Sequence, residues 1–232
     1  MGEFMQLGTS RMQCIGAYMA RPREQARGGI VVVQEIFGVN AWVRSVVDRF
    51  AAHGYAAIAP AFFDHVERGA ELGYDEANFA RGRALVGEIS FDLAVEDVAS
   101  AAQSIASVGK VGVVGYCWGG TIALLSAVRL GLPAVSYYGA RNVQILDQPL
   151  AAPVQFHFGE QDNSIPAAAV QRHRDGYAEA IRAGQVEIYT YPAGHAFDRD
   201  VDPTHYAAAS AKLARERTLA FFGRNLAATA GA

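Results

Sequence analysis

Residues 110–120 read KVGVVGYCWGG, and this stretch decides the fold class. A short apolar run rich in valine ends at Tyr116, and Cys117 and a glycine pair lead directly into an apolar helical pattern over 119–130. Short, nearly continuous apolar runs with β-branched residues are typical of buried parallel strands. The stretch therefore predicts a strand that turns sharply into a helix at Cys117.

The remaining chain alternates short apolar runs with longer amphipathic segments in the same way. Strands alternating with helices form βαβ units, so we expect an α/β fold with a mostly parallel central sheet and helices on both faces. Predicted strands cover 11–19 at the edge, 29–35, 55–59, 110–116, 133–138, 153–158 and 185–191. Predicted helices cover 41–53, 119–130, 166–183 and 203–225.

The segment 61–108 interrupts this alternation. It holds a polar loop and then two expected helices with no strand between them. We expect a small cap segment here, within 61–90. Because α/β domains commonly run to about 250 residues undivided, the whole chain of 232 residues is expected to form one domain, 1–232.

Composition excludes several classes of protein. The 51% of hydrophobic residues excludes a disordered chain, and two cysteines exclude a disulfide scaffold. A net charge of −3 without a basic run argues against a nucleic-acid partner. No apolar run reaches the roughly 18 residues of a membrane span, and the first residues lack a secretory pattern. We expect a cytoplasmic protein without a membrane partner, a monomer or a homodimer.

The segment around Cys117 has the pattern G-x-C-x-G, a nucleophile elbow with cysteine in place of serine. N–H groups at the start of the following helix favour a thiolate at this position. Two alternatives stay open: a buried cysteine that packs as a small apolar residue, and a glycine-rich turn that binds a nucleotide phosphate. The glycine spacing does not give G-x-G-x-x-G, and no G-x-x-x-x-G-K-[ST] occurs.

A cysteine nucleophile needs a base and an orienting carboxylate. Of six histidines, His195 lies in the loop that follows the predicted strand 185–191, where active residues of parallel sheets occur. Asp162 follows the predicted strand 153–158, although a helix cap or loop role would also explain it. The order Cys117, Asp162, His195 is the order of nucleophile, acid and base in α/β-hydrolases.

Four separated motifs carry a family resemblance: QEIFGVN (34–40), GYCWGG (115–120), GEQD (159–162) and GHAF (194–197). With them the chain resembles the dienelactone hydrolases, also called carboxymethylenebutenolidases, of the α/β-hydrolase superfamily. The resemblance implies that Glu35 contacts the resting cysteine and controls its ionisation, and that the backbone N–H groups of Ile36 and Trp118 form the oxyanion hole. Glu35 alone would also fit a structural carboxylate at the end of a strand.

The resemblance also implies arginines that bind a substrate carboxylate. Arg199 matches one of them, and the second is expected from the cap, where Arg81 and Arg83 stand; solvated surface arginines are the alternative for both. Phe37 and Phe197, together with Trp118, are candidates for an apolar substrate slot, or else simple core residues.

We therefore expect a hydrolase that opens a small dienelactone-like ester or lactone through a thioester on Cys117. The alternatives are a promiscuous carboxylesterase, thioesterase or phosphotriesterase that uses the same triad, and a non-catalytic binding module. No cofactor and no metal are expected, because H-E-x-x-H, C-x-x-C and ligand clusters are missing from the sequence. Cys14, in the predicted edge strand, is expected to be an inert packed thiol.

Overall fold

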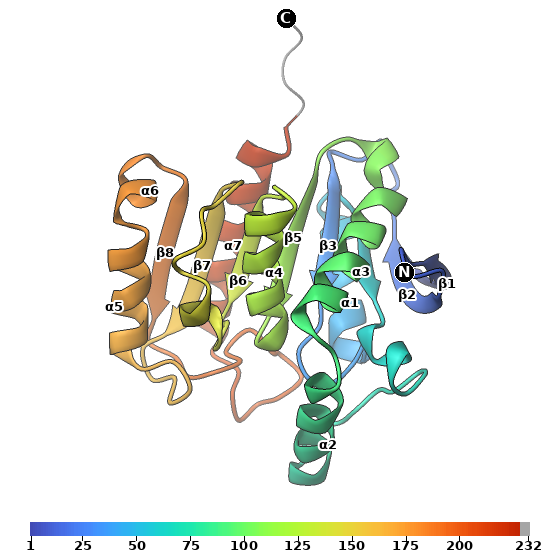
Figure 1. The fold of residues 1–232 in the computed structure, drawn as a ribbon, viewed down its shortest axis with the longest axis horizontal. Helices are drawn as coiled ribbons and strands as arrows, with labels where there is room; N and C mark the ends of the chain where they lie inside the picture. Colours follow the sequence, from blue (N-terminus) through green and yellow to red (C-terminus); the bar gives the residue numbers. More distant parts are fainter. Residues whose placement is uncertain (228–232) are drawn as a thin grey trace, which may run out of the picture. The chain divides into compact units, whose positions relative to one another are not determined.

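The computed structural model describes residues 1–227 and has an α/β fold with a mostly parallel sheet, as predicted (Figure 1). The expected domain 1–232 includes residues 228–232, which lie outside the described part. The strands are β1 (Glu3–Gly8), β2 (Cys14–Ala20), β3 (Gly29–Val33), β4 (Ala56–Pro60), β5 (Val111–Tyr116), β6 (Ala134–Tyr137), β7 (Val154–Gly159) and β8 (Val186–Tyr191). The helices are α1 (Ala41–Ala52), α2 (Glu76–Gly87), α3 (Phe91–Ser104), α4 (Trp118–Arg129), α5 (Ala167–Gly176), α6 (Ala178–Arg182) and α7 (Ala208–Asn225). Short 3-10 turns are η1 (Phe62–His65), η2 (Ala106–Val108) and η3 (Asn142–Gln144).

The strands are hydrogen-bonded in the order β1-β2-β4-β3-β5-β6-β7-β8. The chain divides into two compact units, the first comprising Met1–Val113 and the residues from Leu226, the second Val114–Asn225. The boundary between the units therefore falls inside β5. No described helix combines the length and apolar character needed to cross a membrane.

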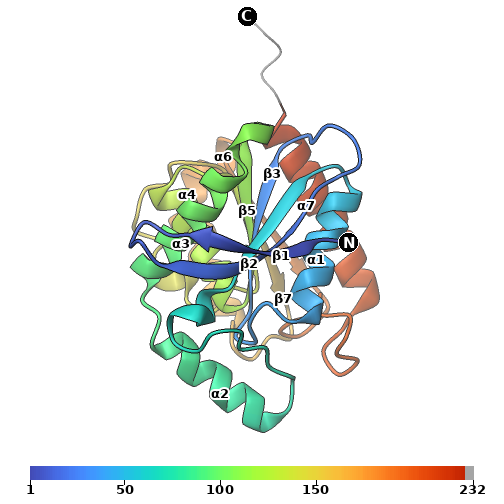
Figure 2. The same ribbon diagram turned by 90° about the vertical axis from the view of Figure 1, so that its right-hand side faces the viewer.

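In the first unit, an antiparallel hairpin of β1 and β2 joins β4, which pairs in parallel with β3. Strands β3 and β4 are buried along their whole length, which explains their unbroken apolar sequences. Helices α1 and α3 lie on opposite faces of these strands (Figure 2). Gly54, at φ +88°, follows the last turn of α1 as the sequence predicted.

In the second unit, β6, β7 and β8 are parallel neighbours. Helix α4 packs on β6 and helix α7 on β7, and Figure 2 shows these two helices on opposite sides of the strands. All residues of β7 are buried, and side chains such as Phe156 and Phe158 fill the core. The carboxyl ends of β7 and β8 lie side by side, because Gly159 pairs with Tyr191.

The predictions for the amino-terminal segment were wrong in two respects. The single edge strand predicted over 11–19 is the second arm of a hairpin, whose first arm, β1, was missed. Cys14 is exposed and not packed. Alternation along β2 explains this: Ile15 and Ala17 fill the inner face, and Cys14 therefore faces outward.

Two predicted helices also differ from the structure. The helix predicted over 166–183 is broken at Tyr177 into α5 and α6. The helix predicted from 203 begins only at Ala208. Asp202 organises the preceding residues as a turn, because its side chain accepts a hydrogen bond from the backbone N–H of Thr204 and its carbonyl accepts one from that of His205.

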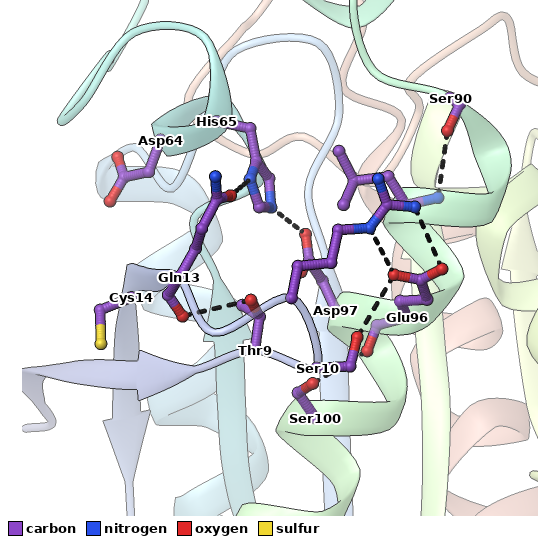
Figure 3. Close-up of polar contacts among 12 residues, drawn as sticks. Thr9, Ser10, Gln13, Cys14, Asp64, His65, Ser90, Glu96, Asp97 and Ser100 are labelled. Atoms are coloured by element: carbon purple, nitrogen blue, oxygen red, sulfur yellow. Dashed lines mark hydrogen bonds and ion pairs between the residues drawn. The ribbon is translucent and has the colours of Figure 1, made fainter.

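A polar cluster links the β1–β2 turn, η1 and α3 within the first unit (Figure 3). His65 bonds Asp97 through Nε2, 2.7 Å from Oδ2, and Gln13 through Nδ1, 3.1 Å from Oε1. Asp97 is fully buried, and its second oxygen has no hydrogen-bond partner within residues 1–227. Burial raises the pKa of Asp97 to about 6, and the nearby charge of Glu96 adds to this rise. His65 and Arg11, which pairs with Glu96, act in the opposite direction and lower the pKa of Asp97.

This raised pKa predicts a pH dependence of folding. Between pH 4 and pH 6 the folded protein keeps a proton on Asp97 that the unfolded chain has released, so the free energy of unfolding falls by up to about 3 kcal/mol as the pH rises. Asp97→Asn cannot titrate. We expect its stability relative to the parent to improve steadily from pH 4 to pH 6 in urea unfolding at constant ionic strength. A difference that is flat with pH would contradict this.

Candidate active site

Cys117 occupies a strained turn between β5 and α4. It is the N-cap of α4, with φ +54° and ψ −113°, a region that non-glycine residues rarely adopt. Such a conformation costs about 1–3 kcal/mol and persists only where the surroundings hold it. Here the backbone N–H of Cys117 donates to the carbonyl of Tyr137 at 3.0 Å, and the carbonyl of Cys117 accepts from Gly120 at 3.0 Å.

The glycines of the motif have a steric reason. A Cβ atom on Gly115 would lie 1.8 Å from the carbonyl oxygen of Gly119, and one on Gly120 would lie 2.6 Å from that of Tyr137. The strand therefore comes so close to the first turn of α4 that only glycine fits. This close approach places the Cys117 side chain at the amino end of the helix, where N–H groups point outward and favour negative charge.

His195 and Asp162 meet on neighbouring loops of the second unit. His195 Nδ1 lies 2.7 Å from Oδ2 of Asp162, whose side chain is fully buried. Oδ1 of Asp162 accepts hydrogen bonds from the backbone N–H groups of Ser164 and Ile165. Both interpretations of Asp162 thus apply: one oxygen organises its own loop and the other orients the histidine.

The loops are held together by backbone contacts. The N–H of Gln161 donates to the carbonyl of Ala193 at 2.9 Å, and a Cβ on Gly159 would approach that oxygen to 2.4 Å. The ring of Tyr138, a contact missed in the sequence, lies 5.0 Å from the His195 ring. Its only sequence signal is its position as the last residue of the strand predicted over 133–138.

His195 also hydrogen-bonds the Cys117 side chain. Burial by itself lowers the pKa of His195, but the negative charge of Cys117 and the hydrogen bond to Asp162 outweigh it and raise that pKa to about 10. The imidazole is therefore protonated at neutral pH and faces the sulfur of Cys117. The three residues predicted from the sequence are brought together in the second unit.

The other predicted residues of this unit have different surroundings. The backbone N–H of Trp118 belongs to the first turn of α4. Phe197 is fully buried and packs against the rings of Tyr138 and Tyr191, which is the position of a core residue. Arg199 is nearly buried, and its Nη2 donates to Asp202 at 2.7 Å.

The predicted residues of the first unit lie along the segment after β3 and on α2. Glu35, Ile36 and Phe37 are buried. Helix α2 packs closely on this segment, since a Cβ on Gly82 would lie 2.0 Å from the carbonyl oxygen of Ile36. The backbone N–H of Leu72, in the loop before α2, donates to the carbonyl of Phe37 at 2.9 Å.

The two candidate arginines of α2 are both exposed, and Arg81 forms an ion pair with Glu67. Among the residues that the structure describes, no group of three or more His, Cys, Asp or Glu side chains is arranged to hold a metal ion.

The model of the dienelactone hydrolase family matches residues 15–226. The chain belongs to the dienelactone hydrolase family. It is 36% identical over 214 residues to the carboxymethylenebutenolidase of Pseudomonas putida, with 89% of each chain covered. It is 28% identical over 216 residues to carboxymethylenebutenolidase 1 of Cupriavidus pinatubonensis, which covers 88% of this chain and 89% of that protein.

Solved structures agree with this assignment. A crystal structure from Klebsiella pneumoniae superposes with a TM-score of 0.84 at 30% identity, covering 97% of this chain and 99% of the other. A dienelactone hydrolase-like promiscuous phosphotriesterase from metagenomic libraries shares the fold, with a TM-score of 0.73 at 19% identity over 97% of this chain and 99% of the other. The fold is that of the α/β-hydrolases, and the protein is a carboxylic ester hydrolase of the dienelactone hydrolase type.

The close approach at the elbow predicts that Gly115→Ala is destructive. The added methyl group must push α4 away from β5, so we expect a loss of at least about 2–3 kcal/mol of stability and of most activity. Gly87→Ala, at the exposed end of α2 with open space around it, is the matched control and should be neutral or slightly stabilising. Equal stabilities of the two variants in denaturant unfolding would refute the close packing of Gly115 against Gly119.

Proposed function

We propose that Cys117, His195 and Asp162 form the catalytic triad of a hydrolase that opens a small dienelactone-like ester or lactone. The observation that carries this proposal is the strained Cys117, hydrogen-bonded to a histidine that Asp162 orients at 2.7 Å. A cysteine that only fills space in a core needs neither a left-handed backbone nor a charged partner. The backbone strain thus favours a nucleophile over a packing residue.

In the proposed reaction, the thiolate of Cys117 attacks the substrate carbonyl and forms a carbon–sulfur bond. The tetrahedral oxyanion is stabilised by the N–H groups of Trp118 and Ile36. As this intermediate collapses, the carbon–oxygen bond of the ester breaks and the His195 imidazolium gives its proton to the leaving oxygen. In a lactone, the alcohol so formed stays in the acyl group. The now neutral His195 then takes a proton from water, which hydrolyses the thioester and releases the acid.

Two roles in this scheme rest on the match of residues 34–40 to the family motif. Glu35 controls the ionisation of Cys117 in the resting enzyme, and Ile36 contributes one oxyanion N–H. Glu35 is buried, which favours a role toward other protein groups over a role at the surface.

For the substrate, we propose a small anionic ester or lactone whose carboxylate is bound by Arg199 and by Arg81 or Arg83. Arg199 is held in place by Asp202, which supports a fixed binding group. On α2, Arg81 pairs with Glu67 and Arg83 is exposed. Phe37 would contribute apolar contact. We further propose a cytoplasmic enzyme, consistent with two free cysteines, that acts as a monomer or homodimer.

Substitution of the nucleophile tests the mechanism. Serine is a far weaker acid than cysteine and needs stronger help from the base, so Cys117→Ser should lower kcat/KM by at least about 100-fold, and Cys117→Ala should abolish turnover. The measurement is hydrolysis of a panel of dienelactones, aryl esters, thioesters and phosphotriesters, with mass spectrometry of the acyl-enzyme. Cys14→Ser is the control and should keep full activity.

The panel separates the candidate functions. Fast turnover of simple esters with inert dienelactones would overturn the proposed carboxylate anchoring and favour a promiscuous esterase. Hydrolysis of every substrate by Cys117→Ala at the parent rate would overturn the triad. A parent protein that hydrolyses nothing on the panel would indicate a binding module.

The charged pair predicts a distinct alkylation behaviour. Because His195 keeps its proton up to about pH 10, its positive charge stabilises the thiolate of Cys117 through the neutral range. We expect iodoacetamide at pH 6 to label Cys117 at least about tenfold faster than the exposed Cys14, as counted by peptide mass spectrometry. In Asp162→Asn this advantage should shrink. Equal labelling of both cysteines at pH 6 would contradict an ion pair.

A further inference from the structure

The turn that carries His195 is strained immediately after the histidine. Ala196 has φ +61°, in the left-handed region that disfavours every residue with a Cβ atom. The turn's own hydrogen bond, from the N–H of Arg199 to the carbonyl of Ala196 at 3.0 Å, closes the loop in this shape. A strained turn of this kind persists only if the surrounding structure holds it.

Arg215, on helix α7, donates three hydrogen bonds to Asp198 and Asp200, which follow this turn. Its Nε donates to Oδ1 of Asp198 at 2.6 Å. Its Nη2 donates to the backbone carbonyl of Asp198 at 2.7 Å and to Oδ2 of Asp200 at 3.1 Å. The Asp198 side chain is fully buried, so this charge-assisted contact is strong and directional.

The strained turn is thus held on two sides. Before His195, the N–H of Gln161 binds the carbonyl of Ala193 at 2.9 Å. After it, the guanidinium of Arg215 binds both the side chain and the backbone of Asp198. His195 lies between these two anchors, and only the second comes from a charged side chain.

We propose that Arg215 is a positioning residue, whose guanidinium holds Ala196 in its strained conformation and so directs His195 toward Cys117. The proposal deepens the proposed function, on which it rests. Arg215 contacts no reacting atom and acts through Asp198. A displacement of the catalytic base by about 1 Å lowers the rate of the chemical step roughly 100-fold. Contacts between the substrate and other residues are unaffected, so substrate affinity stays the same.

A double-mutant cycle separates positioning from simple stabilisation. Arg215→Lys keeps the charge but loses the planar fork. Glycine adopts φ +61° without strain, so in an Ala196→Gly background the turn keeps its shape with less need of the anchor. If Arg215 holds Ala196 in its strained conformation, the effect of Arg215→Lys on kcat depends on whether residue 196 is alanine or glycine. If Arg215 only stabilises the fold, the effects of the two substitutions on kcat are independent.

The experiment compares the parent, Arg215→Lys, Ala196→Gly and the double variant, using the best ester substrate of the panel. We expect Arg215→Lys to lower kcat by about 10- to 100-fold with KM changed less than about threefold. In the Ala196→Gly background, the loss caused by Arg215→Lys should shrink to less than about threefold. Lys212→Ala, which removes an exposed ion pair on the same helix, is the control and should stay within about twofold.

Two results would overturn the proposal: a kcat for Arg215→Lys within twofold of the parent, or the same kcat loss in both backgrounds. Unfolding is measured for each variant. Asp200→Asn removes the negative charge from one of the three hydrogen bonds, and this milder change should lower kcat by less than Arg215→Lys does. If Arg215→Lys fails to fold, Asp200→Asn decides in both backgrounds: a loss abolished by Ala196→Gly supports the proposal, and an equal or absent loss overturns it.

The failure of the proposed function would look different. A parent without Cys117-dependent turnover refutes the function itself. In that case the same four proteins are compared by the rate at which iodoacetamide labels Cys117 at pH 6. This rate depends on the position of His195 and not on turnover. Labelling that slows in Arg215→Lys and recovers with Ala196→Gly supports the anchor; labelling that is unchanged by Arg215→Lys refutes it.

Discussion

The approach of β5 to the first turn of α4 is the constraint on which the candidate site depends. A methyl group on Gly115 would lie 1.8 Å from the carbonyl oxygen of Gly119, so the two elements meet at a distance that no other residue allows. Cys117 must then adopt φ +54° to connect them. The resulting strain is balanced by the burial of β5 and α4, and it places the sulfur where helix N–H groups favour negative charge.

Electrostatics around the sulfur follow from this geometry. His195 reaches Cys117 from the loop after β8, and Asp162 orients the histidine from the loop after β7. The two loops run side by side because β7 and β8 pair in parallel up to Gly159 and Tyr191. Burial alone would lower the pKa of His195, and the electrostatic and hydrogen-bonding interactions with Cys117 and Asp162 together raise it to about 10.

Most of the fold was predictable because its strands are buried on both faces and therefore carry unbroken apolar runs. The segments that were mispredicted lie where that signal weakens. Strand β1 is largely exposed, so its sequence lacks a buried stripe. The helix predicted over 166–183 breaks at Tyr177, directly after Gly176, because a single glycine inside a helical pattern does not by itself show that the helix ends there. The buried pair of His65 and Asp97 was missed because its partners are 32 residues apart.

The sequence by itself determined the α/β class, the elbow and the three residues His195, Asp162 and Cys117, because each lies at the end of a recognisable apolar strand or beside glycines with a steric purpose. Only the tertiary structure decided how those residues are held. Asp162 hydrogen-bonds both its own loop and His195, and Arg215 binds Asp198 in the turn after His195. The contacts of Asp162 with His195 and of Arg215 with Asp198 join segments that are distant along the chain. Local propensity carries no record of such contacts, since they arise only when the elements pack.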